Sequence, residues 1–187
     1  MNDSKLTDEE FEELIHMAES KNAYTFCSIQ NSTLGEIVLP HGKIDFEKDK
    51  GFGYEHIVYG RTVKDKLNVD QVAGLLIKTL ELLKNTKDCE LYNAFGKNRK
   101  FVLKDDIKVI LSKETLFDKD VWVITSYPLF EKDTKAIKKE TLDFLSTVNA
   151  TEEYTQYYSS FRNIVGALVS NIIITKNKQN VNGGQEI

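Results

Sequence analysis

The stretch that decides the fold runs from residue 99 to residue 127, with RKFVLKDDIKVILS at 99–112 and VWVITSY at 121–127. Apolar and polar side chains tend to alternate along it, which is typical of strands that bury one face. Turn residues such as Asp105-Asp106 separate the runs. Connections this short cannot carry a parallel crossover, so the pattern predicts an antiparallel meander. Its strands are predicted at 90–95, 99–104, 107–112 and 121–127.

Helical periodicity flanks this sheet on both sides. A capping box at Thr7 and Glu10 predicts a helix through Ser20, and the apolar stripe over 69–84 is the strongest helix signal in the chain. After residue 133, two further helices are predicted, at 135–148 and from Thr151 onward. We therefore predict an α+β fold in which N-terminal helices pack on a four- to five-stranded antiparallel sheet, with C-terminal helices added.

No internal repeat or Gly-, Ser- or Pro-rich linker divides the chain. The sequence predicts an α+β domain over 1–133 with its core at about 35–130. A C-terminal helical extension at 134–176 is expected to pack on it, and a polar tail at 177–187 is expected to be flexible.

Composition excludes several classes of protein. The 187 residues are 41% hydrophobic and 29% charged, which excludes collagen-like and wholly disordered chains. The net charge of −4 gives no support to a basic protein that coats nucleic acid. The excess acid lies before residue 51, however, where five basic and eleven acidic side chains give −6, whereas residues 51–130 carry thirteen and eleven, a net +2.

Cysteine usage and hydropathy bear on the compartment. Cys27 and Cys89 lie far apart and outside any C-x-x-C pattern, which favours a reducing compartment over a disulfide scaffold. The N-terminus lacks the basic start and apolar stretch of a signal peptide, and the run from Ile164 to Ile174 is too short to span a membrane. We expect a cytoplasmic protein that needs no membrane, metal or other cofactor.

Three motifs place reactive side chains at the predicted ends of elements. The first is Gly51-x-Gly53-x-x-His56-Ile57 with Arg61 downstream, and the second is Arg99-Lys100 beside the turn that contains Lys97. The third is the strand end Thr125-Ser126-Tyr127. A histidine, cations and hydroxyl groups without a carboxylate cluster suit metal-free RNA cleavage, which needs proton transfer and donors for the charge on phosphorus.

In their order and spacing, these motifs resemble the barnase/EndoU/colicin/RelE superfamily of metal-independent ribonucleases, especially its phage-associated branch. The resemblance covers about residues 35–130. It implies that His56 is the general acid/base, that Arg61 and Lys100 hold the phosphate, and that Thr125, Ser126 or Tyr127 orients it. The chain departs from the family where Arg61 occupies the region in which a second histidine often follows.

The resulting hypothesis is an endoribonuclease-like protein, associated with toxins or phage, that cleaves RNA by acid/base transphosphorylation. Lys97 and Arg99 would add substrate contacts, although charged strand edges also arise simply to prevent aggregation. Expected partners are RNA, an immunity or antitoxin protein, and a second copy bound through the C-terminal helices.

Two other hypotheses stay open. The first is a catalytically degraded interaction module of the same fold that binds protein or RNA. The second is a nucleotide-using transferase built on Gly51-x-Gly53, although that pair lacks the third glycine of a dinucleotide motif and is more simply a turn.

Overall fold

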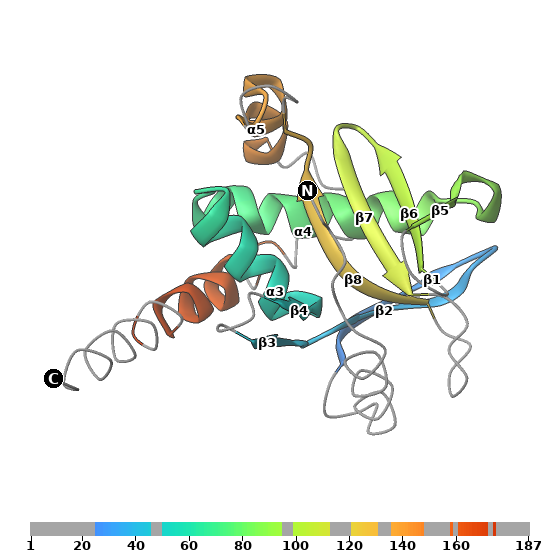
Figure 1. Ribbon diagram of the computed structural model, residues 1–187, viewed down its shortest axis with the longest axis horizontal. Helices are drawn as coiled ribbons and strands as arrows, with labels where there is room; N and C mark the ends of the chain where they lie inside the picture. The colour runs from blue at the N-terminus through green and yellow to red at the C-terminus, as the bar shows by residue number, and fades with distance from the viewer. Residues whose placement is uncertain are drawn as a thin grey trace, which may run out of the picture.

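The computed structural model describes residues 25–45, 50–94, 99–112, 121–130, 136–147, 158, 161–171 and 174. The strands are β1 (Thr25–Asn31), β2 (Gly35–Pro40), β3 (Lys43–Asp45), β4 (Lys50–Phe52), β5 (Tyr92–Asn93), β6 (Arg99–Lys104), β7 (Ile107–Ser112) and β8 (Val121–Pro128). The helices are α3 (Gly53–Tyr59), the π-helical turn η1 (Gly60–Lys64), α4 (Val69–Asn85), the 3₁₀ turn η2 (Asp88–Glu90), α5 (Lys139–Ser146) and a C-terminal helix at 161–171 (Figure 1).

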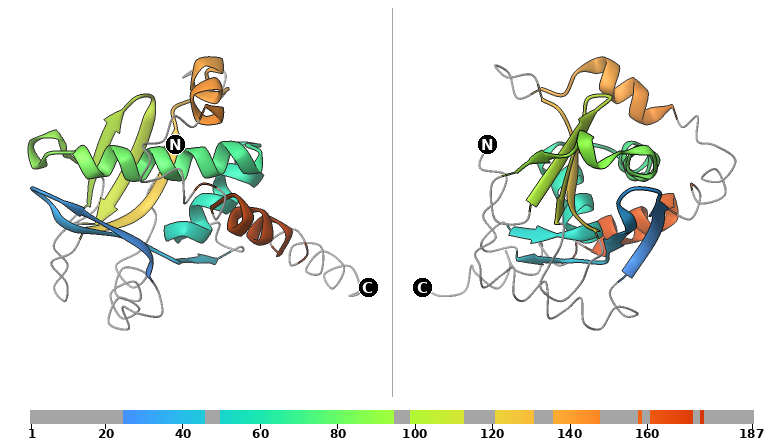
Figure 2. Two further views of the ribbon diagram at one scale, coloured as in Figure 1. Left: turned by 180° about the vertical axis from the view of Figure 1, so that it is seen from behind. Right: turned by 90° about the vertical axis from the view of Figure 1, so that its right-hand side faces the viewer.

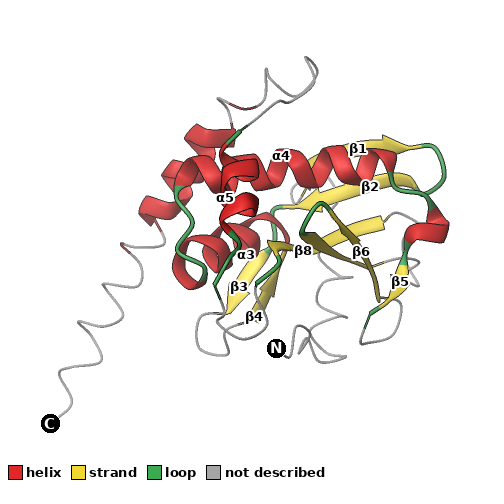
Figure 3. Ribbon diagram, turned by 90° about the horizontal axis from the view of Figure 1, so that it is seen from above, coloured by secondary structure: helices red, strands yellow, loops and turns green. Residues whose placement is uncertain are grey.

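The main sheet has six strands in the order β1-β2-β8-β7-β6-β5 (Figure 3). From β5 to β8 the strands follow one another antiparallel, whereas β2 pairs with β8 in parallel at Ile37–Val121 and Val38–Trp122. The prediction of a four- to five-stranded antiparallel meander is therefore wrong for the sheet as a whole. The physical reason for this difference is the β1–β2 hairpin. It comes much earlier in the chain, and β2 pairs with the free edge of β8 after a long crossover.

The helices that pack on the sheet also differ from the prediction. The N-terminal helix predicted at residues 7–20 lies outside the described residues, and α3 and α4 come between β4 and β5. The prediction that N-terminal helices cover the sheet is therefore corrected to helices inserted within the strand order. α4 runs from Val69 to Asn85, so the helix predicted at 69–84 is confirmed.

Alternation along β6, β7 and β8 divides their side chains between two faces of the sheet. The helix face packs on α4, which Figure 2 shows end-on beside the sheet. Its apolar side chains are Val102, Ile107, Val109, Leu111, Val121 and Val123. The opposite face is called the outer face below, and by the strand register it carries Arg99, Phe101, Leu103, Lys108, Ile110, Ser112, Trp122, Thr125 and Tyr127.

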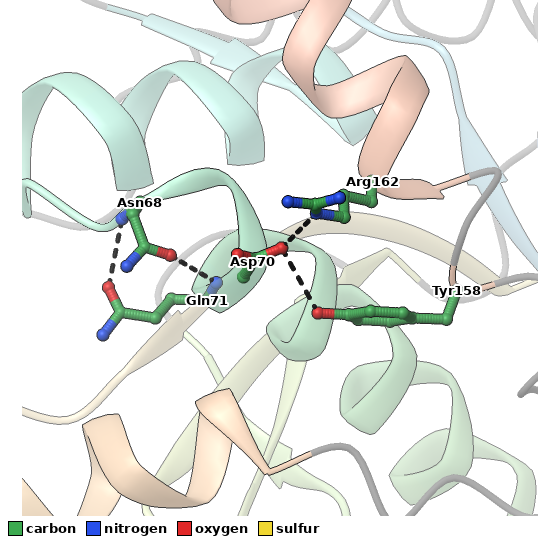
Figure 4. Close-up of polar contacts among 5 residues, drawn as sticks. All are labelled: Asn68, Asp70, Gln71, Tyr158 and Arg162. Atoms are coloured by element: carbon green, nitrogen blue, oxygen red, sulfur yellow. Dashed lines mark hydrogen bonds and ion pairs between the residues drawn. The ribbon is translucent and has the colours of Figure 1, made fainter.

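The N-terminus of α4 is fixed by a capping box and by the C-terminal helix (Figure 4). The Asn68 side chain accepts a hydrogen bond from the Gln71 backbone at 2.9 Å, and the Gln71 side chain accepts one from the Asn68 backbone at 3.0 Å. Asp70, in the first turn, pairs with Arg162 and accepts a hydrogen bond from the Tyr158 hydroxyl at 3.5 Å. A carboxylate is favoured at this end of the helix dipole.

The C-terminal helices share the main core. Leu145 of α5 and Phe161 and Val165 of the 161–171 helix are buried in the same cluster as the α4 side chains. Within the described ranges, no helix is both long and apolar enough to cross a membrane.

Candidate functional site

The outer face carries a continuous series of aromatic and cationic side chains, which we call the aromatic–cation ladder. The ring of Tyr92 on β5 stacks on Phe101 of β6 with centroids 5.4 Å apart. Lys108 of β7 places its Nζ 4.7 Å from the Phe101 ring centroid and 5.9 Å from that of Tyr127 on β8. Arg61 of η1 ends the series with its Cζ 5.2 Å from the Tyr127 ring centroid. Four neighbouring strands thus present π-faces and positive charge over about 14 Å.

The β6–β7 turn sets the register that builds the ladder. Asp105 and Asp106 both have positive φ, at 51° and 56°, as a two-residue hairpin that matches the strand twist requires. Aspartate tolerates this conformation better than most residues. The hairpin places Leu103 opposite Lys108, and the β7–β8 register places Lys108 opposite Tyr127.

The ladder differs in exposure from one end to the other. Tyr92 is 58% exposed, and Phe101, Lys108 and Tyr127 are half-buried. Arg61 is buried, with only 9% of its surface exposed. The Tyr92 end is therefore the accessible part, and Lys108 is its most accessible cation.

Arg61 is held in place by a buried ion pair. Its Nε lies 3.0 Å from Asp65 Oδ2, four residues on, and both side chains are at most 10% exposed. Burial raises the pKa of the Asp65 carboxyl above its usual value, although Arg61 opposes that shift. The π-helical turn directs Arg61 to Tyr127, and such turns occur often at functional sites. Because Asp65 neutralises much of its charge, Arg61 positions Tyr127 more than it attracts a phosphate.

His56 lies on α3, which packs against β8 and β2. Its side chain is half-buried against β4, where a Cβ added to Gly51 would come within 2.8 Å of His56 Nδ1. The next residue of β4, Phe52, packs on Ile110 and Ile124 from the outer face. A Cβ on Gly51 would also lie 2.5 Å from the Lys43 carbonyl oxygen, so Gly51 is required for the close approach of both the histidine and strand β3.

Gly53 is required for the turn that begins α3. Its φ is +72°, and a Cβ there would lie 2.6 Å from the Pro40 carbonyl oxygen. Both glycines of the motif therefore serve backbone geometry, Gly51 within β4 and Gly53 at the turn into α3.

The remaining residues of the predicted site lie in different places. Thr125 is buried on the outer face beside Tyr127, whereas Ser126 points to the helix face, where its hydroxyl lies 2.6 Å from that of Thr79 on α4. Lys100 also belongs to the helix-face parity of β6, and its Nζ donates to Asn93 Oδ1 at 2.6 Å. It lies two strands from β8, about 10 Å away. The structure therefore groups Tyr127 with Arg61 and Thr125, and it separates Lys100 and Ser126 from them.

The structure describes one of the two predicted substrate contacts. Lys97 lies outside the described residues. Arg99 begins β6, is 6% exposed, and pairs across the sheet with Ser112.

A Ser126→Ala substitution tests the structural role of that hydroxyl. Because the Thr79 hydroxyl would lose a buried partner, we expect the free energy of unfolding to fall by about 1–2 kcal/mol in urea denaturation. A Ser146→Ala variant on the exposed surface of α5 is the matched control, and an equal effect in both variants would contradict this role.

Tyr92, Phe101 and Lys108 were not among the predicted site residues. For Lys108 the signal was present in the sequence, since it interrupts the apolar run of β7, whereas Phe101 begins the apolar run of β6 and does not stand out. Grouping them with Tyr127 needs the strand register, which the sequence does not specify.

Comparison with known proteins adds no relative, since no protein-family model, curated protein or solved structure matches the chain.

Proposed function

We propose that the protein binds single-stranded RNA across the outer face of its sheet. The aromatic–cation ladder is the observation that carries this proposal. Unpaired bases stack on aromatic side chains, and sheets that present aromatic residues on neighbouring strands are a recurring way to bind them. Lys108 lies between two of the rings, so a base stacked on either ring brings its phosphate near a positive charge.

The overall charge of −4 does not oppose this proposal, because the acid is concentrated before residue 51. On the ladder itself, the carboxylate of Asp65 is already paired with Arg61. We expect a modest dependence of affinity on salt, since few phosphates are contacted by cations.

Cleavage of the bound RNA is the second candidate function, and the contact between Arg61 and Tyr127 favours it. In this mechanism His56 takes the proton of a ribose 2′-hydroxyl, and the 2′-oxygen forms a bond to phosphorus. The bond from phosphorus to the 5′-oxygen then breaks, and that oxygen receives a proton from a second group, for which Tyr127 is the candidate. The products are a 2′,3′-cyclic phosphate and a 5′-hydroxyl.

Binding without cleavage is favoured by two observations. Lys100 and Ser126 lie on the helix face, and Arg61 is already paired with a carboxylate. This alternative corresponds to an interaction module of the same fold. A toxin or phage setting and an immunity partner remain hypotheses that rest on the family resemblance alone.

The binding proposal is tested with a Phe101→Ala variant. Loss of one stacking ring should weaken binding about 10- to 100-fold. The measurement is the fluorescence anisotropy of a labelled RNA with 2′-O-methyl riboses, which cannot undergo transphosphorylation. Leu103→Ala is the matched control, because Leu103 is an exposed residue on the same face of the same strand but offers no ring. Equal affinity of the Phe101→Ala variant and wild type would overturn the proposal.

A further inference from the structure

A second row of side chains crosses the outer face beside the aromatic–cation ladder. Arg99 of β6 pairs with Ser112 of β7, and Ser112 pairs with Trp122 of β8. Side chains opposite one another on neighbouring strands have Cβ atoms about 5 Å apart, so the three lie side by side. We call them the donor row.

The donor row is buried, and two of its polar atoms have no hydrogen-bond partner among the described residues. Ser112 is 2% exposed, Trp122 is 5% exposed and Arg99 is 6% exposed. The Ser112 hydroxyl and the Trp122 indole Nε1 are the buried atoms without a partner. Buried polar groups are nearly always hydrogen-bonded, so a pair of unsatisfied groups on adjacent strands needs an explanation.

The chemistry of the row specifies the kind of group that would satisfy it. The Trp122 indole can only donate, an arginine can only donate, and the Ser112 hydroxyl can do so. The two donors without a partner, Ser112 and Trp122, lie beside the positive charge of Arg99, and together they match an oxyanion with several acceptor oxygens. Their burial strengthens each such bond because water does not compete.

We propose that the donor row binds a phosphate group. Arg99 lies two residues before Phe101 on the same strand and the same face, about 7 Å away. A strand whose base stacks on Phe101 therefore has a backbone phosphate near the end of β6, beside the Ser112 and Trp122 donors that have no partner among the described residues. In this form the inference rests on the proposed RNA binding, and it adds the subsite that takes the phosphate.

The only tryptophan of the chain lies in this row, so its fluorescence reports on the subsite directly. Inorganic phosphate is titrated into the full-length protein at constant ionic strength, with chloride as the comparison ion. We expect a saturable change of Trp122 emission with phosphate and none with chloride. Absence of a saturable change would overturn the proposal and leave a buried water as the partner of the two donors.

Two variants test the assignment of the donors. Ser112→Ala should weaken phosphate binding at least about 10-fold, the loss of one hydrogen bond to a charged group. Trp122→Phe keeps an aromatic ring but removes the Nε1 donor, and its binding is measured from the ³¹P NMR signal of phosphate. Ser28→Ala, at an exposed position of β1 in the same sheet, is the control. If both Ser112→Ala and Trp122→Phe bound phosphate with the affinity of wild type, the assignment of the donors would be wrong. Two variants are used so that poor folding of one does not prevent the test.

A competition experiment separates this inference from the proposed function. A single-stranded oligonucleotide that displaces inorganic phosphate identifies the backbone phosphate as the ligand. Phosphate binding that no oligonucleotide displaces identifies the free ion, and it supports the subsite while counting against RNA binding at this face. RNA binding without any phosphate binding would overturn the subsite alone.

Discussion

An Asn31→Ala variant is expected to lose about 3–4 kcal/mol of its free energy of unfolding. Asn31 ends β1, is 6% exposed, and joins the β1–β2 hairpin to the C-terminal end of α4. Its Nδ2 donates to the carbonyl oxygens of Leu83 at 2.7 Å and Thr86 at 2.8 Å, with a longer contact to that of Lys84 at 3.1 Å. The last carbonyls of a helix have no partner within it, so Asn31 supplies what α4 lacks.

The side-chain oxygen of Asn31 stabilises the β1–β2 hairpin turn. Asn31 Oδ1 accepts hydrogen bonds from the backbone nitrogens of Thr33 at 2.8 Å and Leu34 at 2.9 Å. Alanine leaves the donors of the turn unsatisfied and removes the Nδ2 donor from the helix-end carbonyls, although Leu83 keeps a longer bond from the Thr86 nitrogen at 3.3 Å. We therefore expect a loss larger than that of a single hydrogen bond.

The measurement is urea denaturation followed by far-UV circular dichroism. Asn31→Asp is a useful second variant, because a carboxylate oxygen can still accept the two hydrogen bonds of the turn but cannot donate to carbonyl oxygens. It also places negative charge at the negative end of the helix dipole. It should be destabilised as well. Asn85→Ala is the control, since Asn85 is exposed and its side chain donates within α4, to the Glu81 carbonyl oxygen at 3.0 Å. A midpoint for Asn31→Ala equal to that of the control would refute the role of Asn31.

Elements with strong local periodicity were predicted well from the sequence. α4, β6 and β7 lie within one residue of their predicted bounds, because a capping box or a two-residue turn marks their ends. β1 was missed, since its sequence TFCSIQN has little period and becomes a strand only by pairing with β2. The contacts of Asn31 join residues more than fifty positions apart, which no local pattern reveals.

Some residues of the candidate site could be found from the sequence. The others differ because alternate side chains of a strand point to opposite faces of the sheet. Ser126 and Tyr127 are neighbours in sequence but point to opposite faces of β8, because successive side chains of a strand alternate. A bulge between Ile110 and Leu111 shifts the β7–β8 register. The cross-strand partner of Tyr127 therefore cannot be found by counting residues back from the Ser112–Trp122 pair. Lys108 therefore takes the place beside Tyr127 in which Lys100 was expected.

For His56 and Arg61, the sequence predicts only that the two residues lie close together along the chain. The sequence places them on one helical segment, whereas the structure divides that segment into α3 and the π-helical turn η1. The buried pair of Arg61 with Asp65 follows from their spacing of four, but its burial depends on how η1 packs.

If the protein cleaves RNA, a His56→Ala variant is expected to lose about 10²- to 10⁴-fold in rate. The substitution removes the one histidine on α3, whose ring lies against Gly51 at the junction of β4 and β8. Because the variant keeps the aromatic–cation ladder, its affinity for the 2′-O-methyl RNA should stay within about twofold of wild type. A loss of rate without a loss of affinity assigns the histidine to proton transfer and not to substrate binding.

The assay follows unmodified single-stranded RNA in excess chelator and identifies 2′,3′-cyclic phosphate ends. His41→Ala is the matched control, because His41 is an exposed histidine whose ring instead packs at the edge of Phe26 with centroids 5.4 Å apart. Its cleavage rate should equal that of wild type. Equal rates for His56→Ala and wild type would exclude His56 as the acid/base. RNA binding without detectable cleavage in any of the three proteins would instead establish the alternative, in which the outer face binds RNA and leaves it intact.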